Sequence, residues 1–273
     1  MKLIVFSKML KELGITELID FAQELGIAGY DMAVRPGYPV NPDNVEEALP
    51  KAAEQFRAAG LEIPMVTAHT NVLLPDAEGE RLMAAMDAAG ARRLKLGYFK
   101  FVPGEMDYWG EVDKARSALE GWAELAQKYN VRACYHTHSQ RCLGLNAGTL
   151  AHLIRGFDPK LIGAFLDAGH LRAEGEEFEV AVAIVKEHLS MVAVKDFLLE
   201  RIDKENHGAV KRRVVEAGQG MCDWTAIFTE LKRIGFDGLV SIHCEFEAEP
   251  NEMMDAIRRE AAFFRGLKEK VGA

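Results

Sequence analysis

Short apolar runs alternate along the chain with longer stretches in which apolar residues recur every three or four positions. The runs are rich in Val, Ile, Leu and Phe, which is typical of buried strands, and the longer stretches have the spacing of amphipathic helices. The predicted strands cover residues 3–7, 27–34, 61–67, 93–98, 131–139, 162–167, 191–196 and 239–245. The predicted helices cover residues 15–25, 44–59, 78–89, 108–129, 147–156, 178–188, 223–234 and 252–271.

The strict alternation of strand and helix limits the possible folds. Successive parallel strands need crossover helices, which are right-handed almost without exception. Eight strand–helix units in 273 residues match the size of a closed (β/α)8 barrel, the TIM barrel of the α/β class. An open doubly wound sheet is the alternative, but it usually has a glycine-rich turn after its first strand, where this sequence has Ser7-Lys-Met-Leu-Lys. The chain shows no linker and no break in composition, so we predict a single domain over residues 1–273.

The composition narrows the range of partners. Lys and Arg number 33 against 42 Asp and Glu, a formal charge of −9, which disfavours a surface for nucleic acid or for an anionic membrane. No apolar run approaches the roughly 20 residues that span a bilayer, and the apolar run at the N-terminus is too short for a signal peptide. The four cysteines form no Cys-x-x-Cys pair. We therefore expect a cytoplasmic protein with reduced thiols and with neither a nucleic-acid nor a membrane partner.

Charged and imidazole side chains gather where the predicted strands end. In a parallel barrel all these ends lie on one rim, which is where barrel active sites are found. Few charged groups are tolerated in a barrel mouth unless they are paired, hydrated or bound to a metal ion. We therefore expect the active site at this rim. The residues at or near it are Lys8, Arg35, His69, His136, His138, Asp167, His170, Lys195, His243 and Glu245.

Several of these segments resemble the xylose isomerase-like TIM barrels, the family of sugar-phosphate isomerases and epimerases, hydroxypyruvate isomerases and endonuclease IV. The resemblance covers essentially the whole chain. The segments that carry it are AGYDMAVRPG (28–37), YHTHS (135–139), LDAGH (166–170), VAVKDF (192–197), EAGQG (216–220) and FDGLVSIHCEF (236–246).

The resemblance implies a divalent metal ion (Mn, Co, Zn or Mg), which the epimerases of this family hold with Glu, Asp, His and Glu from strands five to eight. Those positions fall on His136, Asp167, Ala193 and His243, with Glu245 two residues farther on, so Asp167 alone keeps its residue type. Imidazole and carboxylate donors still suit such metals. We therefore predict His136, Asp167, His243 and Glu245 as metal ligands in an atypical branch of the family. The alternative is that the histidines hydrogen-bond to carboxylates in the barrel mouth without a metal.

Three residues are predicted to catalyse proton transfer: Glu245, Lys195 and His136. Glu245 is the first candidate for the base, followed by His136 or His243. Lys195 is expected to point inward, where it stabilises an oxyanion, carries a proton or forms a Schiff base. A buried ion pair with Asp167 or Glu245 is the alternative for this lysine.

A second group of residues is predicted to contact the substrate. Arg35 follows the second strand, and its planar fork suits a carboxylate or a phosphate, although a salt bridge at the rim is as common. Lys8 follows the first strand and can reach the mouth. The other members of this group are His69, His138 and His170.

The region after the seventh strand raises the question of phosphate binding. Lys211-Arg-Arg213 precedes Gly218 and Gly220, near the place where barrels often hold phosphate. A solvated basic face is the alternative. Asp196 is expected to face away from the barrel interior and to be structural.

These expectations describe an enzyme that isomerises or epimerises a small sugar, sugar phosphate or sugar acid. In such chemistry a base removes a proton next to a carbonyl, and a metal or a cation stabilises the enediolate. Three alternatives stay open: a lyase such as a dehydratase acting on a polyol or keto acid, a metal-dependent nuclease, and a sugar-binding protein without turnover. The negative charge speaks against the nuclease. A homo-oligomer agrees with the resemblance, but no sequence feature decides it.

Overall fold

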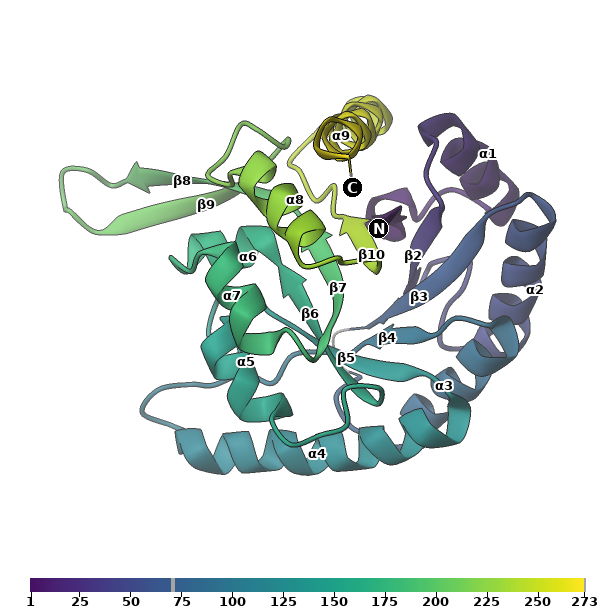
Figure 1. Cartoon of the computed structure of the whole chain (residues 1–273), viewed down its shortest axis with the longest axis horizontal. Helices are drawn as coiled ribbons and strands as arrows, with labels where there is room; N and C mark the ends of the chain where they lie inside the picture. Colours follow the sequence, from purple (N-terminus) through teal and green to yellow (C-terminus); the bar gives the residue numbers. More distant parts are fainter. Residues whose placement is uncertain (70–71, 273) are drawn as a thin grey trace.

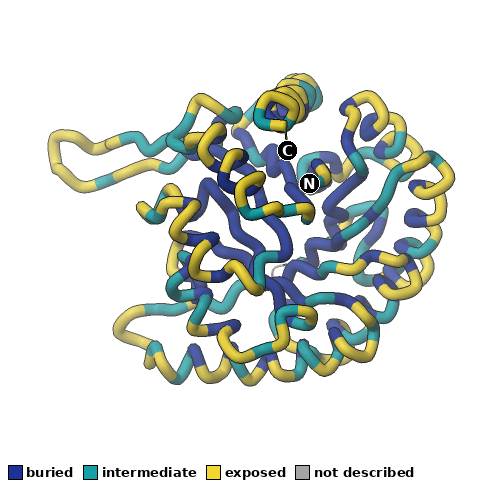
Figure 2. Tube along the Cα trace, viewed as in Figure 1, coloured by how far each residue is buried: buried dark blue, intermediate teal, exposed yellow. Residues whose placement is uncertain are grey.

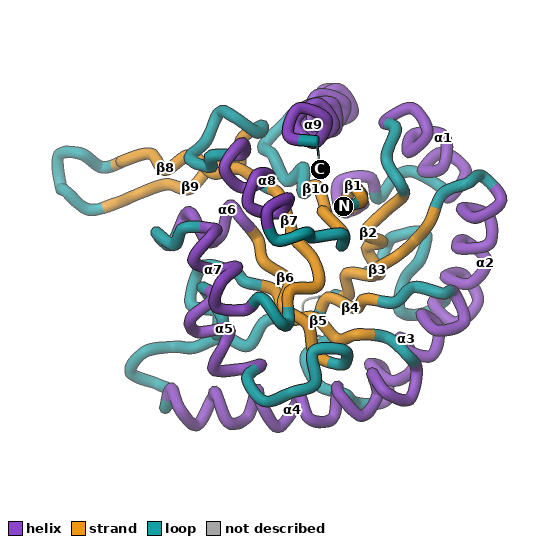
Figure 3. The backbone as a smooth tube through the Cα atoms, in the orientation of Figure 1, coloured by secondary structure: helices purple, strands orange, loops and turns teal. Residues whose placement is uncertain are grey.

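The computed structural model shows a closed parallel barrel and describes residues 1–69 and 72–272. The barrel strands follow one another in the order β1-β10-β7-β6-β5-β4-β3-β2, and β1 pairs with β2 to close the ring. Helices surround these strands on the outside (Figure 1 and Figure 3). The predicted (β/α)8 fold is therefore confirmed.

The observed elements lie close to the predicted ones. The barrel strands are β1 (Lys2–Phe6), β2 (Gly29–Val34), β3 (Glu62–Ala68), β4 (Arg93–Lys95), β5 (Arg132–His136), β6 (Ile162–Asp167), β7 (Leu189–Val194) and β10 (Leu239–Ile242). The helices are α1 (Ile15–Leu25), α2 (Val45–Ala58), α3 (Ala77–Ala89), α4 (Tyr108–Tyr129), α5 (Ala147–Ile154), α6 (Ala168–Ala173), α7 (Phe178–Val185), α8 (Trp224–Arg233) and α9 (Pro250–Val271). Strands β4, β5, β7 and β10 end two or three residues before the predicted limit, so their last polar residues lie in loops at the mouth.

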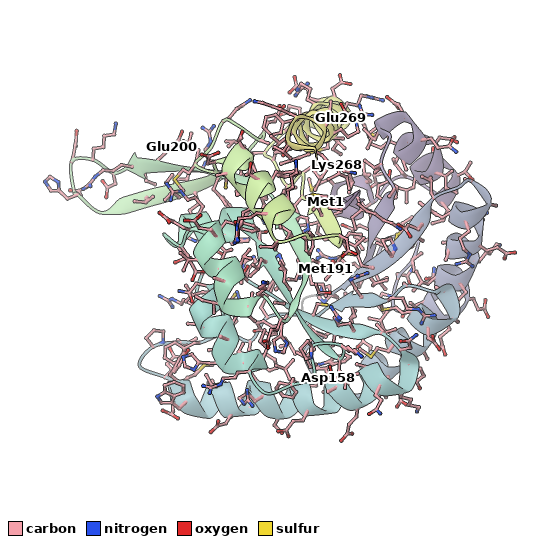
Figure 4. The ribbon with its side chains drawn as sticks, viewed as in Figure 1. Met1, Asp158, Met191, Glu200, Lys268 and Glu269 are labelled. Atoms are coloured by element: carbon pink, nitrogen blue, oxygen red, sulfur yellow. The ribbon has the colours of Figure 1, made fainter. Side chains whose placement is uncertain are left out.

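Two features were not predicted. Helix α6 contains His170, which the sequence analysis placed in a loop. The second feature is an antiparallel hairpin of β8 (Asp196–Ile202) and β9 (Ala209–Val215). The hairpin projects away from the barrel (Figure 1), its outer part is largely exposed (Figure 2), and Glu200 lies on it, outside the ring of helices (Figure 4). Its strands mix apolar and charged residues without the strict alternation by which half-buried strands are recognised.

Two apolar clusters hold the barrel together. The larger one lies between strands and helices and includes the fully buried Trp122, Phe56 and Phe264. The smaller one fills the barrel interior with Ile4, Met65, Cys134, Phe165, Met191, Ala193 and Leu239.

The interior cluster also explains where the polar residues lie. Side chains alternate along a strand, so the residue two positions after an inward apolar residue also points inward. Cys134 is followed in this way by His136, and Phe165 by Asp167. The barrel is therefore apolar in its middle and polar at the C-terminal end of its strands.

Local sequence signals begin and end these elements. The carboxylate of Asp76 caps α3 by accepting hydrogen bonds from the N–H groups of Glu78 and Gly79. Gly26 ends α1 with φ of 63°, in the left-handed region that favours glycine. At Gly29 a Cβ atom would lie 1.8 Å from the carbonyl oxygen of Glu62, so β2 can approach β3 only with glycine at this position.

Two predictions about the environment can be compared with the structure. None of the helices within residues 1–69 and 72–272 has the length and apolar character needed to cross a membrane. Cys134, Cys142, Cys222 and Cys244 are all free thiols, as the lack of paired cysteine motifs predicted.

Glu260 is a buried carboxyl group on α9, outside the barrel. It is 1% exposed. Its Oε2 accepts a hydrogen bond of 2.9 Å from the N–H of Ala217, and its Oε1 has no hydrogen-bond partner. Burial raises the pKa of Glu260 to about 8. The folded state therefore holds this proton more tightly than the unfolded state, and the free energy of unfolding falls as the pH rises from about 4.5 to about 8.

We predict that Glu260→Gln removes most of this pH dependence, because the amide does not titrate. Between pH 5 and 8.5 the free energy of unfolding, measured by urea denaturation, should fall by about 2–4 kcal/mol in the wild type and by much less in the variant. Glu252→Gln, which replaces an exposed side chain on the same helix, is the control. Equal pH slopes for the wild type and Glu260→Gln would contradict the assignment.

Candidate active site at the barrel mouth

Lys195 lies at the centre of a charged cluster in the barrel mouth. Its Nζ donates a hydrogen bond of 2.8 Å to Oε2 of Glu245 and lies 3.6 Å from Oδ2 of Asp167. Burial alone would lower the pKa of Lys195, but these two carboxylates raise it above its ordinary value. Lys195 is therefore a permanent cation, and the prediction that it points inward is confirmed.

The ammonium group of Lys195 lowers the pKa values of both carboxylates. Burial opposes the ionisation of Glu245, yet Lys195, His243 and Lys8 hold the pKa of its carboxyl far below the ordinary range. Lys8, on a short 3-10 helix (Ser7–Leu10), forms an ion pair with the other oxygen of Glu245. Burial also opposes the ionisation of Asp167, and Lys195 in turn lowers its pKa. Glu245 is thus a weak base in this arrangement, which disfavours its predicted role as the first base.

The segment LDAGH fixes Asp167 beside Lys195. The Oδ1 atom of Asp167 caps α6 by accepting a hydrogen bond of 2.9 Å from the N–H of His170. Between them, Gly169 lies so close to β7 that a Cβ atom would be 2.0 Å from the carbonyl oxygen of Lys195. Glycine at this position therefore allows the close approach that lets Asp167 and Lys195 interact.

His136 and His243 lie on opposite sides of the mouth and have opposite tendencies to hold a proton. Their rings are nearly parallel, with centroids 6.0 Å apart and an interplanar angle of 15°. Burial lowers the pKa of His136 well below its ordinary value, and nearby Lys95 adds to the effect. Burial also acts against the charged form of His243, but the carboxylates of Asp31 and Glu245 outweigh it and raise its pKa. One ring therefore favours the neutral form and the other favours the protonated form.

His138 and His170 form a second imidazole pair, with centroids 4.0 Å apart. Nδ1 of His138 lies 2.8 Å from the carbonyl oxygen of Ser139, and Nδ1 of His170 lies 2.8 Å from Oγ of Ser139. Burial lowers the pKa of His138 to about 4 and that of His170 well below its ordinary value. Both rings are therefore neutral near pH 7. Tyr98 packs against His138 at 4.3 Å and its hydroxyl lies 3.0 Å from Nδ1 of His136.

Several buried polar atoms of the site have no hydrogen-bond partner. Such an atom typically costs about 1–3 kcal/mol, so a group of them indicates a place prepared for a ligand or for water. Within the described part of the chain, the site contributes Arg35 Nε, His136 Nε2, Asp167 Oδ2, His170 Nε2 and His243 Nε2.

The approach to the buried residues is lined by half-buried polar side chains. Lys8, Arg35, Tyr98, His138 and Glu245 are partly exposed, whereas His136, Asp167 and His243 are at most 2% exposed. The guanidinium of Arg35 stacks over the ring of Phe6 at 5.4 Å. A ligand that enters from solvent would meet these half-buried groups first.

His69 has a different environment from the other predicted site residues. It follows β3 and lines a small cavity with Val45 of α2 and Leu82 of α3. The structure thus places it beside the helix layer, and its predicted contact with substrate stays a prediction.

Two charged residues of the mouth were missed by the sequence analysis. Asp31, in β2, is fully buried and accepts hydrogen bonds from the hydroxyls of Thr67 (2.7 Å) and Ser241 (3.1 Å). Lys95, the last residue of β4, is 3% exposed. Asp31 is the single charged residue of the apolar strand β2, and that pattern could have revealed it.

The glycine amides and the basic side chains after the seventh strand have acidic partners within the protein. The amides of Gly218 and Gly220 donate hydrogen bonds to the carboxylate of Asp196, so they are not free to bind an anion. Lys211, Arg212 and Arg213 lie on β9 of the hairpin, where each has a glutamate within 4 Å. Asp196 is fully buried, and its predicted structural role agrees with these bonds.

The predicted metal ligands do not gather around a common point. Among residues 1–69 and 72–272, no three His, Cys, Asp or Glu side chains form a group that could hold a metal ion. The ammonium group of Lys195 lies between the carboxylates of Asp167 and Glu245 and already compensates their charge. The donor set therefore does not fit a metal in this arrangement.

Comparisons with known proteins agree with the fold. A model of the xylose isomerase-like TIM barrel family matches residues 19–267. An inosose dehydratase from Lactiplantibacillus plantarum is 25% identical over 164 residues, which are 55% of this chain and 52% of that protein. The chain thus spans about half the length of the curated relatives that it matches.

Two solved structures illustrate the structural likeness. The 3-keto-D-glucoside 4-epimerase YcjR from E. coli superimposes with a TM-score of 0.75 at 16% identity, over 97% of this chain and 99% of its own. The IolI protein, whose structure contains a zinc atom, superimposes with a TM-score of 0.74 at 16% identity, over 98% and 99%. Identities this low show the shared fold alone.

We predict that Lys195→Met destabilises the protein strongly at pH 7, by about 3–5 kcal/mol, because it leaves the buried carboxylate of Asp167 without its cation and takes one of two cations from Glu245. The deficit should shrink as the pH falls toward 5, since Asp167 and Glu245 then take up protons in the folded variant. Urea denaturation at several pH values measures both effects. Lys8→Met, which removes a more exposed partner of Glu245, is the control and should cost about 1 kcal/mol or less. Similar losses for both variants would contradict the central role of Lys195.

Proposed function

The chain belongs to the xylose isomerase-like TIM barrel family, and from this premise we propose that it is an enzyme that moves a proton next to the carbonyl of a small hydroxylated substrate. The substrate class is a sugar, a sugar phosphate or a sugar acid, and the reaction is an isomerisation or epimerisation. This proposal rests on the facing pair of His136 and His243. The sequence resembles epimerases that have glutamates at these two positions.

The environments of these two imidazoles suit opposite roles. A pair of titratable groups with pKa values pushed apart is the usual arrangement for a general base and a general acid. Neutral His136, with an unpartnered Nε2, serves as the base that removes the proton. Protonated His243, held between Asp31 (3.7 Å) and Glu245 (3.8 Å), serves as the acid that returns one. The Nε2 atoms of both rings have no hydrogen-bond partner, so both can meet a substrate at the nitrogen edges of the rings.

Lys195 supplies positive charge where the reaction develops negative charge. Its ammonium is buried and already oriented by Asp167 and Glu245, so it needs no reorganisation to stabilise an oxyanion. Glu245 orients Lys195 and His243, in place of the predicted role as the first base. Arg35, Lys8, His138 and His170 contact the substrate hydroxyls or its carboxylate.

A dehydratase begins with the same removal of a proton, and the partial similarity to inosose dehydratase favours it as the second candidate. The product separates the two functions. An isomerase or epimerase retains all the oxygen of its substrate, whereas a dehydratase releases water.

We predict that His136→Gln and His243→Gln each reduce turnover by about 10²–10⁴-fold, the usual contribution of a general acid or base. A panel of ketoses and keto acids is incubated with the wild type in D2O, and NMR follows both the exchange of the C–H next to the carbonyl and any loss of water. His152→Gln, which changes an exposed histidine of α5, is the control. Exchange that persists at the wild-type rate in both variants would exclude the paired imidazoles.

The divalent ion, whether Mn, Co, Zn or Mg, is tested on its own. We predict that dialysis against EDTA leaves the exchange rate of the wild type unchanged, because Lys195 supplies the compensating charge. Metal analysis of the dialysed protein confirms that the ions are absent. Loss of exchange on dialysis, with recovery on adding back one of the four ions, would overturn the role given to Lys195 and restore the predicted metal site.

A further inference from the structure

Lys95 is a second buried lysine of the barrel mouth, and the mechanism above does not use it. It ends β4, where it pairs with Thr67 of β3 and with Cys134 of β5. Thr67 contacts Asp31 and Cys134 belongs to the interior cluster. Lys95 therefore points into the barrel, and it is only 3% exposed.

The contacts of Lys95 differ from those of an ordinary buried lysine. Its Nζ donates a long hydrogen bond of 3.4 Å to the carbonyl oxygen of Leu96 and lies 4.2 Å from the centre of the Tyr98 ring. In the described part of the chain, no carboxylate lies within 4 Å of it to form an ion pair. Asp31, the charge that most favours the ammonium form of Lys95, already accepts hydrogen bonds from the hydroxyls of Thr67 and Ser241.

The two lysines of the mouth therefore have opposite tendencies to hold a proton. Burial lowers the pKa of Lys95 to about 7, the positive charges of Arg35 and Lys195 act in the same direction, and Asp31 and Glu245 oppose them. A large fraction of Lys95 is thus an uncharged amine at neutral pH, whereas Lys195 is held as an ammonium. An uncharged amine in a desolvated pocket is a nucleophile toward carbonyl carbon, and an ammonium is not.

We propose that Lys95 forms a covalent imine with the carbonyl group of the substrate. This inference rests on the proposed function and names the group that activates the C–H bond. It moves the Schiff-base role, which the sequence analysis left open for Lys195, to a residue that the sequence analysis missed. The ligand class is a ketone or aldehyde of a small hydroxylated compound.

The chemistry balances without any further reagent. The lone pair of Nζ attacks the carbonyl carbon, and the carbonyl oxygen takes up one proton from the amine and one from a general acid. It then leaves as water, so that the C=O bond is replaced by a C=N⁺ bond. The adjacent C–H then loses its proton to a base, and its electron pair moves toward the nitrogen to give an enamine. Reprotonation and hydrolysis return the free lysine.

The neighbours of Lys95 are suited to this sequence of steps. Tyr98, whose ring lies under Nζ, places its hydroxyl 3.0 Å from Nδ1 of His136. The neutral imidazole is thus connected to the amine through one side chain and serves as the base for the adjacent C–H. Lys195, on the other side of the charged cluster, faces the substrate oxygens.

The test is reductive trapping. The wild type, Lys95→Met and Lys100→Met are incubated with dihydroxyacetone, D-fructose or pyruvate and treated with sodium borohydride. Intact mass and peptide mapping then locate the product, which adds the mass of the carbonyl compound less one oxygen atom. We expect a stoichiometric adduct on the peptide that contains Lys95, absent from Lys95→Met and retained in Lys100→Met, which removes an exposed lysine of the same segment. The yield should increase with pH around a midpoint near 7.

The deuterium exchange described above separates the two proposals. Exchange without an adduct on Lys95 overturns the imine and leaves the proton transfer in place. An adduct on Lys95 without exchange supports the covalent site and overturns the proton transfer. Wild-type adducts confined to surface lysines, or an undiminished adduct yield in a Lys95→Met variant that unfolds at the same temperature as the wild type, also overturn the imine.

Discussion

The barrel mouth depends on one electrostatic constraint: the buried ammonium of Lys195 must compensate the buried carboxylate of Asp167 and the half-buried carboxylate of Glu245. Lys195 comes directly after β7, and its partners Asp167 and Glu245 come from β6 and from the loop after β10. Removing a charged group from water costs several kcal/mol, and the cost is offset only when the opposite charge is held in place. This requirement fixes the ends of three strands relative to one another. Gly169 belongs to the same constraint, because a larger residue would separate α6 from the carbonyl of Lys195.

The four imidazoles around this cluster differ in their tendency to hold a proton because their surroundings differ. The carboxylates of Asp31 and Glu245 raise the pKa of His243, whereas burial and nearby cations lower the pKa values of His136, His138 and His170. Different surroundings likewise lower the pKa of Lys95 and raise the pKa of Lys195. Unpartnered buried atoms lower the stability of the fold, and here they are concentrated where a substrate would supply the missing partners.

The fold could be predicted from the sequence because strand–helix alternation and its length admit few architectures. The sequence also predicted that Lys195 points inward and lies close to Asp167, since alternation along a strand decides which face a residue occupies. The hairpin after β7 could not be predicted, because its strands lack a strict alternation of apolar and polar residues. The properties of Lys95 could not be predicted either, since its lowered pKa comes mainly from burial, with smaller contributions from Arg35 and Lys195, and only the folded chain creates these surroundings.

Asp196 links the hairpin to the barrel through hydrogen bonds from the amides of Gly218, Gly220 and Cys222 and from the indole of Trp224. These bonds close the base of the hairpin independently of its tip. Residues beyond this clamp can be lengthened, shortened or replaced during evolution while Lys195, one residue before it, keeps its position. The outer part of the hairpin can therefore change in sequence between relatives without disturbing Lys195 or the barrel mouth.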